Sequence, residues 1–155
     1  MAYTTIDNPE LYFQVKTYTG NGGTLAITLD GSENMSPNFV WIKERNSTSS
    51  HALTDTVRGN TKKLKSDGND AEETNTNLIT SFDSDGFTLG NNGNANQSSS
   101  QTYVAWNWKA GTSFTNDASG TGIGSIDSAG SVNQDAGFSI ISYTGTGSAA
   151  TVAHG

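Results

Sequence analysis

Apolar and polar residues alternate in several short runs along the first 110 residues, a period of two that is typical of strands with one buried face. The runs are residues 11–18 (LYFQVKTY), 25–29 (LAITL), 39–43 (FVWIK), 51–57 (HALTDTV) and 103–109 (YVAWNWK). Glycine, aspartate and asparagine turn residues separate them, including the strong pairs at 30–31 and 85–86. About seven or eight strands over residues 1–110 predict an all-β fold, an antiparallel β-sandwich or lectin-like jelly roll.

The large apolar residues of these runs are the expected core of the sandwich. The expected core residues are Phe13, Phe39, Trp41, Phe82, Phe87 and Trp106. Residues 70–82 are the one plausible helical stretch, although threonine and asparagine are poor residues for a helix interior. Residues 91–100 contain no apolar side chain larger than alanine, which predicts an exposed and mobile loop.

Composition and charge narrow the classes of function. Only 32% of the 155 residues are hydrophobic and only 15% are charged, a composition that disfavours a helix bundle. The net charge of −7 disfavours binding of nucleic acid through its phosphates. No run of about 18 apolar residues is present, so we expect no membrane insertion. Cysteine is absent, which excludes disulfides and thiol nucleophiles.

The chain changes character after residue 110. Residues 111–155 carry three aspartates and neither lysine nor arginine. Within them, residues 111–137 are rich in glycine, serine and threonine, and their apolar residues are isolated. This composition predicts an extended polar linker, or a strip that gains its order from another surface.

The segment that follows the expected linker repeats an earlier one. Residues 138–147 (FSIISYTGTG) match residues 13–22 (FQVKTYTGNG) at five of ten positions, with a constant offset of 125. One interpretation is that residues 138–155 begin a second repeat of the domain. The other is that they form an inter-subunit strand, for which the interface candidates are Phe138, Ile140, Ile141 and Tyr143.

Several motifs resemble a family of repeated β-domains in virion structural proteins of marine bacteriophages, including cyanophages. These motifs are YTG at 18–20, FVWIK at 39–43, the 51–59 segment ending in VRG, AEET at 71–74, SFDSDGFTLG at 81–90 and YVAWNWKAG at 103–111. The resemblance covers nearly the whole chain. It implies a tail-fibre, tail-associated or other virion-surface protein, often several repeats long, made in the bacterial cytoplasm and assembled with other virion proteins.

Catalytic and metal-binding interpretations have little support in the sequence. His51 and Asp55 would lie about 13 Å apart along one strand, too far for a direct hydrogen bond. No nucleophile elbow accompanies them, so we expect no enzymatic activity and no cofactor. Asp83 and Asp85 are a weak calcium candidate, but a tight turn is the preferred interpretation. We expect Arg58 to pair with an acidic residue such as Asp55.

Three functional hypotheses remain open. The leading one is a non-enzymatic structural module that anchors or assembles a phage tail fibre or surface appendage, as a homo-oligomer. The first alternative is a lectin-like module that binds host surface glycans, for which Trp108 is the candidate residue, although Trp108 could instead cover a domain junction. The second alternative is a self-assembling subunit that exchanges a strand through residues 138–143.

Overall fold

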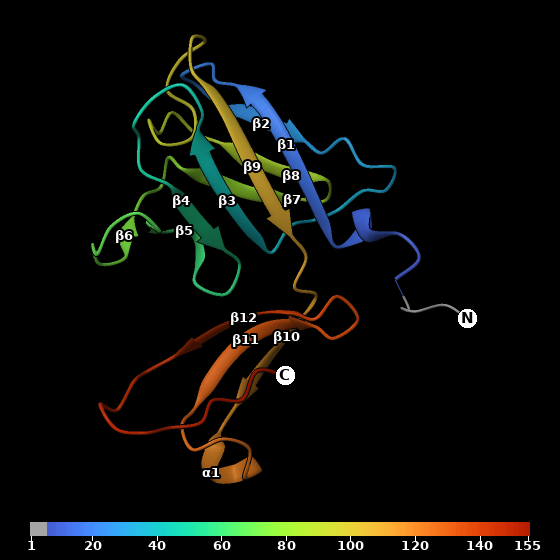
Figure 1. Ribbon diagram of the computed structural model, residues 1–155, viewed down its shortest axis with the longest axis vertical. Helices are drawn as coiled ribbons and strands as arrows, with labels where there is room; N and C mark the ends of the chain where they lie inside the picture. The colour runs from blue at the N-terminus through green and yellow to red at the C-terminus, as the bar shows by residue number, and fades with distance from the viewer. Residues whose placement is uncertain (1–5) are drawn as a thin grey trace.

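The computed structural model describes residues 6–155 and is built almost wholly from antiparallel strands (Figure 1). Strands hold 43% of the residues and helices 5%, so the all-β class expected from the alternating pattern is confirmed. The strands form two parts, a sandwich of two sheets and a separate three-stranded sheet.

The sandwich consists of a large and a small antiparallel sheet. A short 3-10 helix, η1 (Pro9–Leu11), precedes its first strand in the chain. The larger sheet has the order β1 (Phe13–Thr19), β9 (Thr102–Trp108), β3 (Phe39–Glu44), β4 (Ala52–Asp55), β5 (Gly59–Leu64) and β6 (Glu73–Thr74). The smaller sheet has the order β2 (Leu25–Thr28), β8 (Gly86–Leu89) and β7 (Ile79–Asp83).

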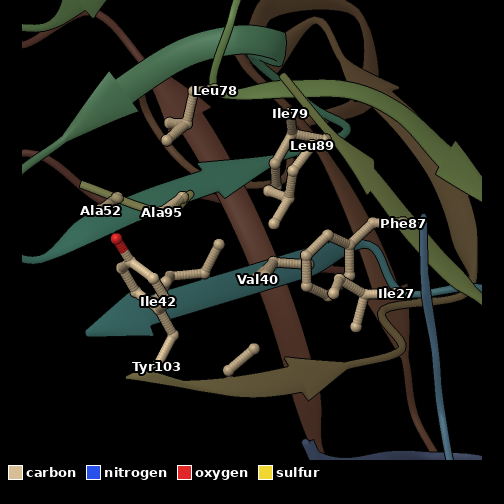
Figure 2. Packing of buried hydrophobic residues seen from close by; sticks show 11 residues of the cluster. Ile27, Val40, Ile42, Ala52, Leu78, Ile79, Phe87, Leu89, Ala95 and Tyr103 are labelled. Atoms are coloured by element: carbon tan, nitrogen blue, oxygen red, sulfur yellow. The ribbon is translucent and has the colours of Figure 1, made fainter. Parts of the chain in front are cut away.

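The hydrophobic core fills the space between the two sheets (Figure 2). Val40 and Ile42 of β3 and Tyr103 of β9 face Phe87 and Leu89 of β8, and none of these side chains is more than 1% exposed. Alternation along each strand turns every second side chain inward, and β3, β4 and β9 of the large sheet contribute residues to the core in this way. Burying a side chain of this size contributes about 1.5–3 kcal/mol, which makes this layer the main source of stability.

Four of the six expected core residues lie on the opposite face of the large sheet. Phe87 is in the core and Phe82 packs against it, as expected. The prediction is wrong for Phe13, Phe39, Trp41 and Trp106, which are absent from the core cluster. In β3 the inward positions belong to Val40 and Ile42, and the lysine at position 43 shares the outer face because side chains alternate.

The helix expected over residues 70–82 does not form, and that prediction is wrong. The segment contains β6, a turn and the start of β7, and the Asn75 side chain stabilises the turn by accepting from the Asn77 N–H at 3.0 Å. β7 then pairs with β8 across the Asp85-Gly86 turn, which was expected. Gly86 has φ +115° and lies against the Ile27 carbonyl, so a larger residue would clash there.

The loop over residues 91–100 is more ordered than its composition predicts. Asn96 is fully buried, and its amide donates to the carbonyls of Gly23 (2.7 Å) and Gly90 (2.9 Å). Its Oδ1 accepts from the backbone N–H of Asn21 at 2.6 Å. The prediction of a fully exposed loop is therefore wrong, because one buried polar side chain satisfies three loop backbone groups at once.

The C-terminal part is a three-stranded antiparallel sheet in the order β10 (Thr112–Asn116), β11 (Ser128–Asn133) and β12 (Phe138–Tyr143), with a short helix α1 (Ala118–Thr121) between β10 and β11. In Figure 1 it lies beyond the end of the sandwich. The expectation of an extended linker over residues 111–137 is wrong, because backbone pairing of β10 with β11 orders it without large apolar residues. Asp117 caps α1 by accepting from the N–H groups of Ser119 and Gly120.

Candidate binding face

Eight apolar side chains cover the outer face of the large sheet, on the side away from the core. We call this set the aromatic face, and its members are Phe13, Val15, Phe39, Trp41, Leu53, Val104, Trp106 and Trp108. The strand register aligns them in rows across the sheet, because directly paired residues of antiparallel strands share a face. One row runs through Phe13, Trp108 and Phe39, and the next through Val15, Trp106, Trp41 and Leu53.

The middle of this face is open. Figure 1 shows β1, β9 and β3 in front of the small sheet, with no other element crossing them on the viewer's side. Val15 is 48% exposed, and Trp41 and Trp106 are half-buried. An exposed group of apolar side chains in one place is a common mark of a binding surface.

Trp41 and Trp106 form a fixed pair at the centre of the aromatic face. Their ring centroids are 5.8 Å apart in an edge-on arrangement with an interplanar angle of 61°. The Trp41 indole N–H donates to Nδ1 of His51 at 2.7 Å, which holds the ring in one orientation. A ligand would therefore meet rings that are already positioned, which lowers the entropy cost of binding.

Charged groups lie at the edges of the aromatic face and are already paired. The Lys43 ammonium donates to the carbonyl oxygens of Glu44 at 2.7 Å and Ser47 at 3.2 Å. At the other end, buried Asp55 accepts from Arg58 Nε at 2.7 Å and from the backbone N–H of Val57 at 3.0 Å. The expected pairing of Arg58 with Asp55 is confirmed, and the central surface is left uncharged.

Trp108 lies at the junction between the sandwich and the C-terminal sheet. Its ring is 4.8 Å from Phe13, 5.3 Å from Phe39 and 5.9 Å from Phe138 of β12, with which it stacks. A cavity of about 350 Å³ adjoins this cluster and is lined in part by Tyr12. These contacts fit a role for Trp108 in covering the domain junction better than a role in glycan binding. The more open rings of the aromatic face belong to Trp41 and Trp106.

The other residues singled out in the sequence lie in separate places. His51 and Asp55 have different partners, so the structure does not assemble them into a catalytic pair. Asp83 accepts from the hydroxyls of Ser81 and Thr88, both at 2.7 Å, and Asp85 accepts from the Met35 N–H at 3.2 Å. Across residues 6–155, no group of three or more histidine, cysteine or acidic side chains could hold a metal ion.

The interface candidates of β12 differ in their surroundings. Phe138 stacks on the sandwich, Ile140 and Ile141 are half-buried, and Tyr143 is 58% exposed. The last residue of β12, Tyr143, is therefore an aromatic residue that contributes little to the packing of this chain.

The central rings of the aromatic face were missed because large aromatic residues were expected inside. One feature of the sequence indicates that Trp41 faces outward, since Lys43 lies two residues later in the same strand and therefore on the same face. The buried polar residues of the inner face obscured that signal. Gln14 and Asn107 both point inward, where Gln14 bonds the Glu10 and Glu33 carbonyls and Asn107 bonds the Gln14 carbonyl.

The fold and the site define an all-β sandwich module with an uncharged aromatic face and an appended three-stranded sheet. The chain belongs to the family described as a domain of unknown function, DUF7483, whose model matches residues 8–155. That match spans both the sandwich and the C-terminal sheet. No curated protein and no solved structure matches the chain. In the part of the chain that the structure describes, no helix has the length and apolar character needed to span a membrane.

Proposed function

We propose that this chain is a non-enzymatic structural module that helps to anchor or assemble a phage tail fibre or another virion-surface appendage. The observation that carries the proposal is the serial arrangement of two β-parts joined by an aromatic contact. The Phe138 ring centroid lies 5.9 Å from that of Trp108 and 6.2 Å from that of Phe39. The C-terminal sheet is therefore packed against the sandwich and not joined to it by a flexible linker alone. A row of β-units in fixed contact suits an extended appendage.

Additional hydrogen bonds support the same fixed arrangement. Oδ1 of Asn38 accepts from the backbone N–H of Ala110 at 2.9 Å and of Gly111 at 3.1 Å. These two bonds fix the chain where it leaves the sandwich. The sequence resemblance to marine phage virion proteins supplies the biological setting of the proposal.

The test is to look for the chain in the particle. Purified virions of the encoding phage should contain the polypeptide by mass spectrometry, and an antibody against the sandwich should label tails or surface fibres in electron micrographs. Its presence only in lysates of infected cells, with none in purified virions, would overturn the proposal.

A second function, favoured by the open tryptophan pair, is recognition of saccharides on a host surface by a lectin-like module. Sugar rings present C–H groups that pack on aromatic faces, and Trp41 and Trp106 offer such faces in a fixed geometry. Because the centre of the face is uncharged, a neutral saccharide chain fits it better than an anionic polymer. This function is compatible with a virion-surface location and does not require it.

A saccharide titration followed by tryptophan fluorescence tests this second function. Oligosaccharides from bacterial surface polysaccharides should change the emission of the intact chain. Trp106→Ala should weaken binding by at least about tenfold, equivalent to 1.4 kcal/mol. The matched control Tyr143→Ala removes an exposed aromatic residue away from the face and should leave affinity unchanged. A panel without any response, or equal losses in both variants, would overturn the assignment.

A further inference from the structure

Residues 134–147 repeat the turn, strand and second turn that residues 9–22 form at the edge of the sandwich. β12 occupies the place of β1 at the offset of 125 residues, since Phe138 corresponds to Phe13 and Tyr143 to Tyr18. The turns before the two strands are also alike. The Tyr12 N–H donates to the Pro9 carbonyl at 3.0 Å, and at the equivalent positions the Gly137 N–H donates to the Gln134 carbonyl at 3.3 Å.

The turn after each strand extends the correspondence. Gly22 has φ +69° and Gly147 has φ +74°, so both copies use the same left-handed backbone at the same position. Further along the two copies differ, since Ile27 lies in β2 and pairs antiparallel with Phe87, whereas its counterpart Val152 makes an isolated parallel bridge to Ile126. Sequence and backbone conformation therefore agree over the strand and the turn that follows it, residues 13–22 and 138–147.

The glycines of the second copy have lost the contacts that explain those of the first. A Cβ at Gly20 would lie 2.7 Å from the Ser98 carbonyl oxygen, and one at Gly22 would lie 2.7 Å from the Gln97 carbonyl oxygen. At Gly145 and Gly147 a Cβ would meet nothing within 4 Å. In the first copy these glycines allow the loop that leads into β9 to approach closely. In the second copy no segment of residues 6–155 lies at the equivalent positions.

The tyrosines show the same difference. Tyr18 stacks on Tyr103 of β9 with ring centroids 5.2 Å apart, and its hydroxyl donates to the Ala95 carbonyl at 2.8 Å. Its counterpart Tyr143 is 58% exposed. The feature that the second copy lacks is thus a strand in the position that β9 takes beside β1.

Hydrogen-bonding direction places that missing strand on the free edge of β12. The Tyr12 carbonyl accepts from the Lys109 N–H, and the Gly20 N–H donates to the Gln101 carbonyl, so even-numbered residues of β1 point toward β9. In β12 the carbonyl of Ile140 lies against Gly130 of β11. Backbone groups alternate in direction along a strand, so residues 139, 141 and 143 point to the free edge. These are the counterparts of residues 14, 16 and 18, which point toward β9.

We propose that the free edge of β12 binds an extended strand of the β9 type, antiparallel, with the counterpart of Trp108 opposite Phe138. The partner is a strand with the Tyr103, Ala105 and Asn107 pattern on one face and aromatic residues on the other. β9 of this chain is already paired on both edges, by β1 and β3, so it is not itself the strand that binds there. This interaction does not depend on saccharide binding by the aromatic face.

Disulfide trapping tests the edge and its register, because the chain contains no cysteine. The full chain with Ser139→Cys is mixed, in a glutathione buffer, with a peptide of the 101–109 sequence carrying cysteine in place of Asn107. Gln14 pairs with Asn107 in the sandwich, so residue 139 should pair with this peptide position. A peptide with cysteine in place of Trp106 is the register control, because a shift of one residue puts the two thiols on opposite faces.

We expect roughly tenfold more trapped peptide from the in-register pair than from the shifted pair. Full-chain Ser113→Cys, on the opposite edge of the same sheet, should trap neither peptide above background. Amide exchange at residues 141 and 143 should slow when the unmodified peptide is added to the unmodified chain. Equal trapping of both peptides, no trapping with unchanged exchange, or disulfide dimers of the chain in place of peptide adducts would each overturn the proposal; the dimers would favour strand exchange between copies.

Discussion

The sandwich and the C-terminal sheet use the same kind of strand but reach order in different ways. All eleven residues of the hydrophobic core cluster belong to the sandwich. In the C-terminal part the buried residues are small or polar, namely Asn116, Ser128, Gly130, Ser131 and Ala153. A sheet needs a hydrophobic face covered by a second layer to be stable alone. The comparison shows that strand pairing sets the shape of both parts, whereas burial supplies stability to only one.

The C-terminal sheet therefore depends on its neighbour. Its main apolar contact with the sandwich is Phe138, which packs on Phe39 and Trp108. Such aromatic pairs contribute about 0.5–1.5 kcal/mol each beyond the area that they bury. We expect the sandwich to be stable without the sheet, but the sheet to lose its order without the sandwich or another partner.

The largest expected effect comes from the core. Phe87→Ala removes a fully buried ring between the two sheets, and the cavity should lower the free energy of unfolding by about 3–5 kcal/mol. Urea denaturation followed by tryptophan fluorescence measures the loss. The control Ile123→Ala removes a side chain that is 59% exposed in the C-terminal part, and should change stability by less than about 0.5 kcal/mol. Equal losses in both variants would contradict the contrast between the two parts.

Removal of the C-terminal sheet should have a moderate effect. A chain ending at residue 111 keeps the whole core, so it should fold with a stability lowered by about 1–3 kcal/mol, the value of two aromatic contacts. Circular dichroism and urea denaturation measure this, and the emission of Trp108 should shift to longer wavelength as its ring becomes exposed. A truncated chain that cannot fold would show that the two parts form one cooperative unit.

A single substitution at the junction should loosen the C-terminal sheet alone. Phe138→Ala removes both ring contacts and should speed amide exchange in β10, β11 and β12 by roughly tenfold, the equivalent of 1.4 kcal/mol. Exchange in β3 and β9 should stay unchanged, because their core contacts are intact. Tyr143→Ala, which removes an exposed ring of the same strand, is the matched control. Protection in β12 that survives Phe138→Ala would show that strand pairing alone holds the sheet.

The sequence predicted the fold class better than it predicted which face of each sheet is buried. Alternation located the strands at residues 13–19, 39–44 and 102–108, because period two is a local property. It left open which face is buried, since Val40 and Ile42 alternate with equally apolar Phe39 and Trp41. Only the packing of the small sheet against one side decides this, and that is a tertiary property. Residues 111–137 were misjudged for the related reason that strand pairing there orders a segment poor in apolar residues.

The smallest expected effect is a pH dependence of stability that comes from the buried Tyr18. Burial raises the pKa of Tyr18 well above its usual range, with a further contribution from Tyr103. The unfolded chain then loses this proton near pH 10 while the folded chain keeps it, so stability should fall as pH rises above about 10. Tyr18→Phe should cost about 1 kcal/mol at pH 8, through the lost hydrogen bond to Ala95, and should flatten the decline above pH 10.

Urea midpoints measured from pH 8 to 11 provide the test. Part of the decline should remain in Tyr18→Phe, because desolvation also raises the pKa of Tyr103. Tyr143→Phe is the matched control at an exposed tyrosine, and at pH 8 it should change stability by less than about 0.5 kcal/mol. Equal declines in Tyr18→Phe and in the unmodified chain would show that the Tyr18 hydroxyl does not contribute to the pH dependence.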